Sequence, residues 1–324
     1  RKRSRREPDD MKVLCIGSAV MDIAATPIED SVNWKEKQRI SDIRILPGGD
    51  AVNQSIHLAD FRVDTALCAC TGDDSTGQML RAALQDRNVD VSVVRSKEGI
   101  RTGTAMVLIN PEGERHIFSV QGAHSTLCAE DLPKVLPEDC RAISLASLFS
   151  MPELEWNGLL PYLQTAHHQN IRVFADLAAD KQGLGLAGIE PFLPEIDYFL
   201  PSLYDVLNMT GTETAEEAAR VFRNLGSDHV IIKWGSDGCY CSDNHFSGWI
   251  SAIPVRPVDT TGAGDCMSAA FIYRILEGDS MEDACRYACA AGSYSTLFVG
   301  ASEAKLTDGR VREFMKTNGD TVLS

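Results

Sequence analysis

The sequence predicts an α/β fold in which helices cover both faces of a mostly parallel central sheet, with a small second β-sheet beside it. Short apolar runs of strand character alternate with helical segments along most of the 324 residues, and this alternation is typical of a parallel sheet. One stretch breaks the alternation, because two strands follow each other there with no helix between them. We therefore expect one domain over residues 11–324, with that stretch forming a lid.

The alternating elements can be assigned in chain order. The first strand, KVLCIG, ends in a glycine, and a sharp turn, PGGD at 47–50, leads into the first helix. The same pattern then repeats, which favours a sheet buried on both faces. The expected strands lie at 12–17, 65–70, 142–148, 172–176, 198–201 and 229–233, and the expected helices at 51–59, 77–87, 156–167, 215–225, 266–277 and 281–297.

The interruption lies between residues 103 and 120. The strand-like runs TAMVLIN and RHIFSV are separated by the turn sequence PEGE, a pattern typical of a β-hairpin with a glycine-containing turn. We expect this hairpin to pair with the segment near 40–46. The predicted lid thus comprises residues 23–46 and 100–122.

Charge and composition limit the possible partners. Residues 1–10, RKRSRREPDD, contain no apolar side chain, and we interpret them as a disordered extension or a remnant of an expression vector. Their arginines would also fit a nuclear or nucleic-acid signal. The remainder carries 26 basic and 43 acidic residues, a net charge of −17. This balance argues against general binding to nucleic acid or to an anionic membrane.

The ten cysteines do not form a disulfide or zinc pattern. Several lie within apolar runs, where cysteine behaves as a small hydrophobic residue, and the C-x-C at 239–241 has no histidine pair to complete a zinc spacing. The sequence also lacks an apolar run of about 18 residues, the length needed to span a membrane. We therefore expect a cytoplasmic protein.

The strongest chemical motif is DTTGAGD at 259–265, between an extended stretch and an amphipathic helix. Gly262, Ala263 and Gly264 carry almost no side chain, so backbone N–H groups at the helix start can approach an anion closely. A phosphoryl group in transfer suits such a pocket. Asp265 at its mouth can accept a proton from an attacking hydroxyl. An ordinary helix cap at Asp265 is the alternative, but the whole string in this context favours chemistry.

A second motif, GGDAVN at 48–53, also enters a helix. Gly48 and Gly49 permit close backbone approach, and the Asn53 amide offers both a donor and an acceptor to ligand hydroxyl groups. Paired glycines before a helix are often only a loop. Together with Asp22, which follows the first strand, they form a plausible site for a polyol.

A third motif, KWGSDG at 233–238, follows the strand at 229–233. Lys233, Gly235 and Gly238 could frame a nucleotide phosphate or ribose. A simple turn between two strands explains the same pattern equally well.

These motifs together resemble the ribokinase-like, or PfkB, family of carbohydrate kinases. The resemblance extends from Met11 to about Ala301. The GGDAVN string matches the first family signature, and DTTGAGD matches the second, which is the more specific of the two. The segment 102–118, with GER at 113–115, is similar to the lid hairpin of the family. Gly300-Ala301 is similar to a late Gly-Ala pair.

The resemblance implies a Rossmann-like domain with a β lid, and transfer of the ATP γ-phosphoryl group to a hydroxyl, usually primary, with Mg²⁺. It implies that Asp265 is the base, that 262–264 form the anion hole, and that Asp22, Gly49 and Asn53 hold the acceptor. Lys233, Gly235, Gly238 and Ser202 would bind the nucleotide, and Asp205 would bind Mg²⁺ through water. Many members also bind a monovalent cation such as K⁺; the matching positions here are Asp259, Thr261, Ser295 and Gly300. A homodimer through the lid edges is a further expectation.

Three positions depart from the family pattern. Ser202 and Asp205 stand where N-x-x-E is common near the metal, and the D-x-N-x-R pattern is incomplete at 176–180. Cys289 stands where ribokinases tend to carry an asparagine near the adenine. These departures leave open a nucleoside kinase, for which Met106 and Trp34 could supply an apolar slot, or a ligand-sensing homologue without activity. A Rossmann dehydrogenase lacks support, because no G-x-G-x-x-G follows the first strand.

Overall fold

The computed structural model describes residues 12–28 and 35–318. Eight strands form the central sheet in the order β14-β13-β12-β11-β10-β9-β1-β4. The strands from β4 to β12 in this order are parallel, whereas β13 and β14 run antiparallel at one edge. The predicted α/β fold with a mostly parallel sheet is therefore confirmed. The bounds are β1 Lys12–Ile16, β4 Asp64–Cys68, β9 Cys140–Leu148, β10 Arg172–Leu177, β11 Tyr198–Phe199, β12 His229–Lys233, β13 Cys239–Ser242 and β14 Ser247–Ile250.

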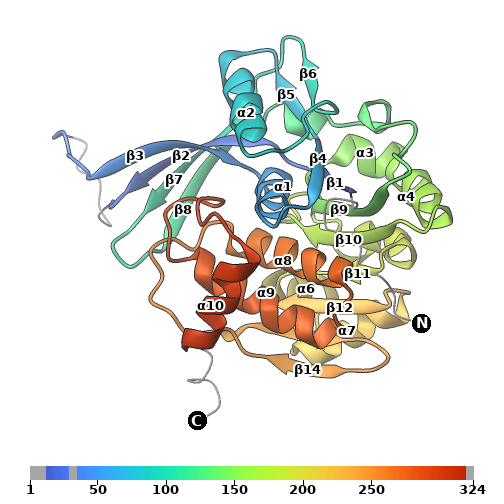
Figure 1. The fold of residues 1–324 in the computed structure, drawn as a ribbon. Helices are drawn as coiled ribbons and strands as arrows, with labels where there is room; N and C mark the ends of the chain where they lie inside the picture. The colour runs from blue at the N-terminus through green and yellow to red at the C-terminus, as the bar shows by residue number, and fades with distance from the viewer. Residues whose placement is uncertain (1–11, 29–34, 319–324) are drawn as a thin grey trace.

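Successive side chains of each strand point to opposite faces of the sheet, and both faces are buried. In β1, Val13 and Cys15 belong to one apolar core, while Leu14 and Ile16 belong to a second core on the other face. This is why the strand reads as a continuous apolar run without alternation. Figure 1 shows α1, α8 and α9 on one side of the sheet and α3 and α4 toward the other.

Ten α-helices lie within the described residues, and most predicted helices are confirmed with small shifts at their ends. The segment predicted as one helix at 156–167 contains the end of one helix and most of a second, which are divided at Gly158, where φ of −158° and ψ of −17° are not helical. The helix predicted from 266 begins three residues earlier, at Ala263. The bounds are α1 Asp50–Asp60, α2 Ser75–Asp86, α3 Pro152–Asn157, α4 Leu159–His168, α5 Gly185–Ile189, α6 Leu203–Thr210, α7 Ala215–Asn224, α8 Ala263–Glu277, α9 Met281–Ser295 and α10 Asp308–Asn318.

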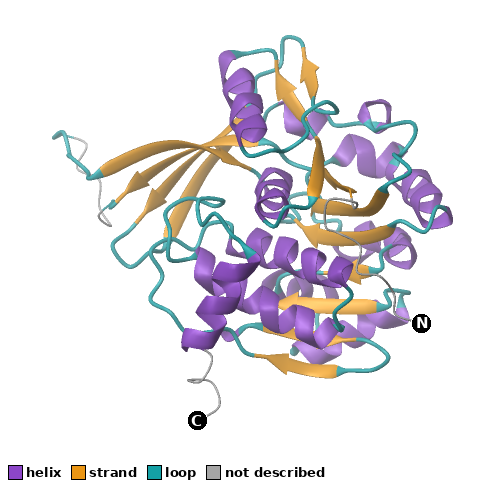
Figure 2. Ribbon diagram, viewed as in Figure 1, coloured by secondary structure: helices purple, strands orange, loops and turns teal. Residues whose placement is uncertain are grey.

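A separate four-stranded sheet, in the order β3-β2-β7-β8, forms the lid. It comprises β2 Val20–Thr26, β3 Asp42–Gly48, β7 Gly103–Ile109 and β8 Arg115–Val120. Figure 2 shows these strands projecting together from the α/β body. The hairpin and the strand near 40–46 are confirmed. The sequence prediction missed β2, because only three residues separate it from β1 although the two strands belong to different sheets.

The predicted strand at 65–70 also divides between two sheets. Its first part is β4 in the central sheet, while β5 Cys70–Gly72 pairs with β6 Arg95–Lys97 in a small two-stranded sheet. No helix among residues 12–28 and 35–318 has the length and apolar character needed to cross a membrane.

Candidate active site

The start of α8 has the geometry of an anion-binding pocket. Gly262 is the residue before the helix, with φ 72°, and a Cβ there would lie 2.6 Å from the Cβ of Ala301. Only glycine fits this position without strain. Gly264 is exposed and Ala263 is partly exposed. The first backbone N–H groups of a helix have no acceptor within the helix. The N–H of Ala263 bonds weakly to the Thr260 carbonyl at 3.4 Å, and those of Gly264 and Asp265 are left for an anion, whose charge the helix dipole favours.

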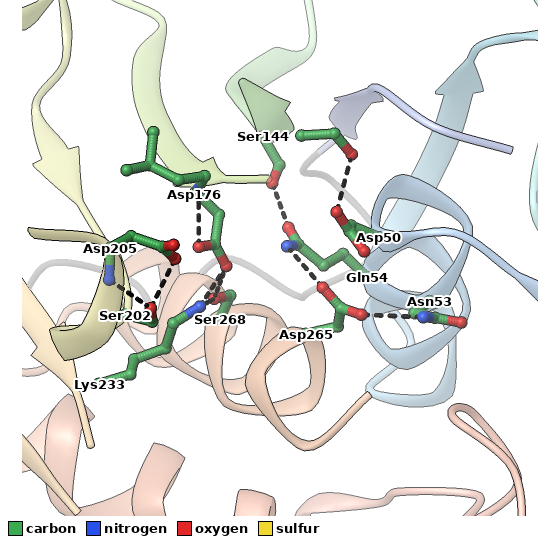
Figure 3. Close-up of polar contacts among 12 residues, drawn as sticks. Asp50, Asn53, Gln54, Ser144, Asp176, Ser202, Asp205, Lys233, Asp265 and Ser268 are labelled. Carbon is green, nitrogen blue, oxygen red and sulfur yellow. Dashed lines mark hydrogen bonds and ion pairs between the residues drawn. The ribbon is translucent and has the colours of Figure 1, made fainter. Parts of the chain in front are cut away.

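Asp265 lies in the first turn of α8 and is buried. Its Oδ2 accepts a hydrogen bond from Asn53 Nδ2 at 2.8 Å (Figure 3), although the two residues are 212 positions apart in the chain. Burial raises the pKa of Asp265 well above its usual value, the charge of Asp50 raises it further, and the bond from Asn53 lowers it. The structure thus places the predicted base beside a predicted acceptor-binding residue.

Gln54 is a neighbour of Asp265 that sequence reasoning missed. Its Nε2 donates to Asp265 Oδ1 at 3.4 Å, and its Oε1 accepts from the Ser144 hydroxyl at 2.6 Å. Ser144 lies on β9, so the carboxylate is oriented by a chain of polar groups that connects α8, α1 and the central sheet (Figure 3). In sequence, Gln54 is simply one more polar residue of a helix. Nothing local indicates that it faces the interior.

Asp22 lies on the lid strand β2, where it pairs in register with Leu46 of β3. Its carboxylate lies directly over Gly48, because a Cβ on that glycine would overlap it. Gly49 has φ 95°, and a Cβ there would lie 2.7 Å from the Ser18 carbonyl oxygen. Burial raises the pKa of Asp22 to about 7, with further contributions from the charges of Asp50 and Asp259. The two glycines therefore let the lid carboxylate meet the start of α1.

Asp50, the first residue of α1, was not singled out by the sequence. Its backbone N–H donates to Ser18 Oγ at 3.0 Å, and its Oδ2 accepts from the Ser147 hydroxyl at 3.2 Å. Burial raises the pKa of Asp50 to about 6, and the charge of Asp176 raises it further. Ser18 follows β1 and Ser147 ends β9, so Asp50 lies over the carboxyl ends of two parallel strands. In α/β sheets this edge is where ligands bind.

Lys233 lies at the end of β12 and forms a buried ion pair with Asp176 (Figure 3). Its Nζ also donates to Ser268 Oγ at 3.2 Å. A Cβ on Gly264 would lie 3.6 Å from the same Nζ, so the ammonium group lies beside the anion pocket. The sequence placed Lys233 among the nucleotide-binding residues. The structure brings it next to the proposed site of phosphoryl transfer.

The rest of the third motif forms a turn between β12 and the antiparallel strand β13. Gly235 is exposed with φ 50°, whereas Gly238 is buried with φ 103° against the Ile250 carbonyl. The alternative of a turn between two strands is therefore correct as a description of the backbone. A nucleotide-binding role for these glycines stays a prediction.

Comparison with known proteins now identifies the family. The model described as "pfkB family carbohydrate kinase" matches residues 10–308. The chain belongs to this family. Ribokinase from Haemophilus influenzae is 27% identical over 84% of this chain and 88% of its own, and ribokinase from Arabidopsis thaliana is 30% identical over 89% and 77%. Relatives named for phosphorylated sugars also match, among them an ATP-dependent ribose-1-phosphate kinase from Halopiger xanaduensis, 28% identical over 81% of this chain and 84% of its own.

Solved structures agree with this PfkB assignment. An Escherichia coli protein described as a ribokinase II, solved with ATP and Mg²⁺, superimposes with a TM-score of 0.83 at 22% identity over 95% of this chain and 99% of its own. Arabidopsis thaliana ribokinase with ribose and ATP has a TM-score of 0.78 at 26% identity over 94% and 99%. The chain is therefore an ATP-dependent carbohydrate kinase of the PfkB family.

Ser202 and Asp205, two residues that depart from the PfkB family pattern, form a helix cap in this chain. Ser202 precedes α6; its hydroxyl accepts from the Asp205 N–H at 3.2 Å and donates to the Asp205 carboxylate at 2.6 Å. Lys233 N–H donates to the neighbouring Pro201 carbonyl at 2.9 Å, so this cap lies beside the end of β12. Carboxylate oxygens are ligands that Mg²⁺ prefers, and Asp205 is partly exposed. The residues present therefore fit a magnesium ion held through water.

The structure brings together three of the four residues predicted for a monovalent cation. Asp259 Oδ1 accepts from the N–H and hydroxyl of Thr261 at 2.8 and 2.6 Å, and Oδ2 accepts from the Gly300 N–H at 2.8 Å. Ser295 directs its hydroxyl to its own helix, at Gly292 O. The carboxylate therefore clamps two loops together. No group of three or more acidic, histidine or cysteine side chains is arranged for a metal within the described ranges, and the K⁺ site stays a prediction.

The lid contacts the loop that leads into the anion pocket. Arg115 on β8 donates from Nη1 to Thr260 Oγ1 at 2.6 Å. The turn before β8 lies against the same loop, since a Cβ on Gly113 would come within 3.0 Å of the Pro257 carbonyl oxygen. The GER string in the lid hairpin is thus a contact between the lid and the segment before the anion pocket.

Proposed function

We propose that this protein transfers the γ-phosphoryl group of ATP to a primary hydroxyl of a small sugar, with Asp265 as the general base and residues 262–264 as the anion hole. One observation carries the proposal above all. A buried carboxylate and an exposed, side-chain-free helix start stand next to each other at the carboxyl edge of the sheet. A base and an anion pocket in contact are what phosphoryl transfer to a hydroxyl needs.

The proposed chemistry begins with the acceptor hydroxyl donating a hydrogen bond to Asp265. The raised pKa of this carboxyl makes it a stronger base than an exposed aspartate, which supports proton removal as the oxygen attacks. Asn53 and Gln54 hold the two carboxylate oxygens in place. Their bonds fix the direction from which the acceptor approaches, and such positioning is a large part of enzymatic rate enhancement.

Negative charge that develops on the transferred group would be stabilised by backbone N–H groups at the start of α8. Lys233 lies close enough to this pocket to contribute its positive charge. Mg²⁺, when bound, would supply further positive charge to the nucleotide phosphates, and Asp205 would hold it through water. Asp176 keeps Lys233 oriented through the ion pair and through Ser268.

The lid would close the site from the acceptor side. Asp22 on the lid would contact the acceptor, and Arg115 connects the lid to the loop before the anion pocket. Closure would exclude water and so limit wasteful hydrolysis of ATP. Its outer face carries exposed apolar side chains, and this supports a homodimer through the lid sheets; they include Ile43, Ile45, Met106, Phe118 and Val120.

A nucleoside kinase is the second candidate. The sequence suggested Met106 as part of an apolar slot for a base, but Met106 shares the outer face of the lid with Phe118, opposite to Asp22, and so does not support this candidate; Trp34 lies outside the described residues. A solved aminoimidazole riboside kinase from Salmonella enterica also has this fold, with a TM-score of 0.77 at 21% identity, so the fold accommodates such acceptors. A ligand sensor without activity is less well supported, because the base and the anion pocket are both intact.

The test is release of ADP from Mg·ATP across a panel of pentoses, hexoses, ketohexoses, keto-deoxy acids and nucleosides. A sugar that supports turnover, with the product phosphorylated at a primary hydroxyl by NMR, would support the proposal. Turnover with nucleosides alone would favour the second candidate. Binding of ATP without turnover on any acceptor would contradict both and favour the sensor.

A further inference from the structure

The acceptor side of the proposed site carries three carboxylates: Asp22 from the lid, Asp50 from the start of α1 and Asp265 from the start of α8. None of them takes part in any of the ion pairs formed within the described residues. Lys233, the cation that opposes the charges of Asp50 and Asp265, is already paired with Asp176. Burial raises the pKa of Asp22 to about 7 and of Asp50 to about 6, so above pH 7 these two groups carry negative charge that no ion pair neutralises.

Asp50 has a position that helix capping does not explain. The residue before the helix, Gly49, makes no side-chain cap, and the Asp50 carboxylate is held by Ser147 at the end of β9 rather than by N–H groups of its own helix. The helix dipole stabilises a carboxylate here, but this effect does not require the side chain to turn toward the sheet edge. Figure 3 shows Asp50 and Asp265 on either side of Gln54, and Asp50 is partly exposed.

A second observation concerns Asn53, one turn after Asp50. Its side chain is 4% exposed, and its Oδ1 has no hydrogen-bond partner while its Nδ2 is bonded to Asp265. A buried oxygen without a partner is costly unless a ligand or an ordered water supplies a donor. The Asn53 oxygen carries no charge, so its missing partner is an observation independent of the carboxylates. It indicates that a hydrogen-bond donor completes the pocket.

The amide N–H groups of Asn53 and Gln54 are directed at Asp265, so the groups left for a ligand on this side are hydrogen-bond acceptors: the Asn53 amide oxygen and, when ionised, the carboxylates. Sugar hydroxyl groups donate to such oxygens. A phosphate or carboxylate group on the acceptor molecule only accepts, and it would add a negative charge a few ångströms from Asp50. At the effective dielectric of a protein site, like charges at that separation reduce binding by about 10²-fold.

We propose that the acceptor is an uncharged polyhydroxy sugar, and that Asp50 is the residue that selects it against phosphorylated and carboxylated sugars. The inference rests on the proposed function and narrows its acceptor class. By this proposal, the chain differs in its acceptor from the relatives named for phosphorylated sugars, although they share its fold. Asp50 acts on the sugar hydroxyl groups directly, and Ser18 and Ser147 orient it.

The experiment compares matched acceptor pairs with the full-length protein and Mg·ATP. The pairs are ribose with ribose 5-phosphate, fructose with fructose 6-phosphate, and glucose with gluconate. For the pair that contains the best acceptor, kcat/KM should favour the uncharged member by at least ~10²-fold. Asp50→Asn should lower that ratio at least tenfold, mainly by raising KM for the uncharged sugar, while KM for ATP stays within about twofold.

Asp64→Asn is the matched control, because it makes the same change of charge at an exposed position at the start of β4. It should leave the ratio unchanged. If Asp50→Asn does not fold, the wild-type ratio measured from low to 0.5 M salt replaces it. The ratio should fall as salt screens the repulsion, and a ratio independent of salt would overturn the proposal.

The outcomes separate this inference from the proposed function. A wild-type preference for the phosphorylated or carboxylated member, or an unchanged ratio in a folded Asp50→Asn protein, overturns the role of Asp50 and leaves the kinase intact. Absence of ADP release with every acceptor, charged or uncharged, contradicts the proposed function itself and the inference with it.

Discussion

Replacing Asp265 with asparagine should remove catalysis while preserving the fold. The substitution keeps the shape of the side chain but removes its basicity. General base catalysis contributes about 10²–10⁴-fold to rate, which corresponds to about 3–5 kcal/mol of transition-state stabilisation. We therefore expect kcat to fall by that factor in the Asp265→Asn variant, with KM for ATP within about threefold of wild type.

The effect on stability follows from the contacts of Asp265. An asparagine at this position keeps one oxygen that can accept a hydrogen bond. Its new NH₂ group would face Asn53, whose Oδ1 is without a partner and could accept after rotation of the amide. At most one hydrogen bond is lost, about 1 kcal/mol, and removal of a buried charge offsets it.

The gain in stability from removing the buried charge of Asp265 depends on pH, and its sign follows from the direction of the pKa shift. Burial raises the pKa of Asp265 in the folded protein well above the ordinary value of 3.8. A carboxyl with a raised folded pKa destabilises the fold as pH rises above the unfolded value, until pH passes the folded pKa. The stability of Asp265→Asn relative to wild type should therefore increase from pH 4 to pH 8, and this gain should disappear near pH 4 and below.

The assays are steady-state ADP release with the best acceptor, calorimetric ATP binding, and thermal unfolding at several pH values. Asp64→Asn again serves as the control, with unchanged activity expected. An Asp265→Asn protein with more than a tenth of wild-type kcat would refute the assignment of the base. A variant that loses ATP binding or unfolds more than about 2 kcal/mol more easily would show that Asp265 is chiefly structural.

Three further predictions concern the site and the lid. Burial raises the pKa of Asp22 to about 7 and of Asp50 to about 6, so wild-type kcat/KM should change between pH 5 and 8. Asp50→Asn should move this transition to lower pH in a pH–rate profile, because it removes the charge that raises the pKa of Asp22. Arg115→Ala should increase ATP hydrolysis without acceptor several-fold by loosening the contact with Thr260, and Arg115→Lys should restore part of the coupling; equal hydrolysis in all three proteins would contradict a role in closure. Phe118→Glu should shift the protein from dimer to monomer in light scattering, and a monomeric wild type at high concentration would refute the lid dimer.

The sequence predicted the central sheet well because its elements depend on local patterns. The strand at 229–233 was predicted with the bounds that β12 has, since its run of Val and Ile is buried on both faces. The strand β2 was missed, because a strand that changes sheets after three residues looks like a connection. The helix predicted at 156–167 ran across the break between α3 and α4 at Gly158, because a single glycine within a helical pattern does not by itself mark the end of a helix.

The candidate site also has parts that could be predicted from the sequence and parts that could not. The motifs at 48–49 and 262–264 could be found from sequence, since at Gly48, Gly49 and Gly262 only glycine allows the backbone angles or close approaches that the structure has. Asp50, Gln54 and Lys233 could not be given their places, because their partners Ser147, Ser144 and Asp176 lie 57 to 97 residues away. Hydrogen bonds at that separation leave no periodic trace in the chain.

The sequence by itself determined the α/β fold, the hairpin lid and the two glycine-rich helix starts, because backbone sterics and strand or helix period act over a few residues. Tertiary structure alone decided that Asn53 contacts Asp265, that Lys233 pairs with Asp176 beside the helix start at 262–264, and that Asp22 and Asp50 lie near the proposed acceptor site. The physical reason is that parallel strands bring their carboxyl ends to one edge of the sheet from positions far apart in the chain. The charge and hydrogen bonding at that edge are properties of the assembled sheet.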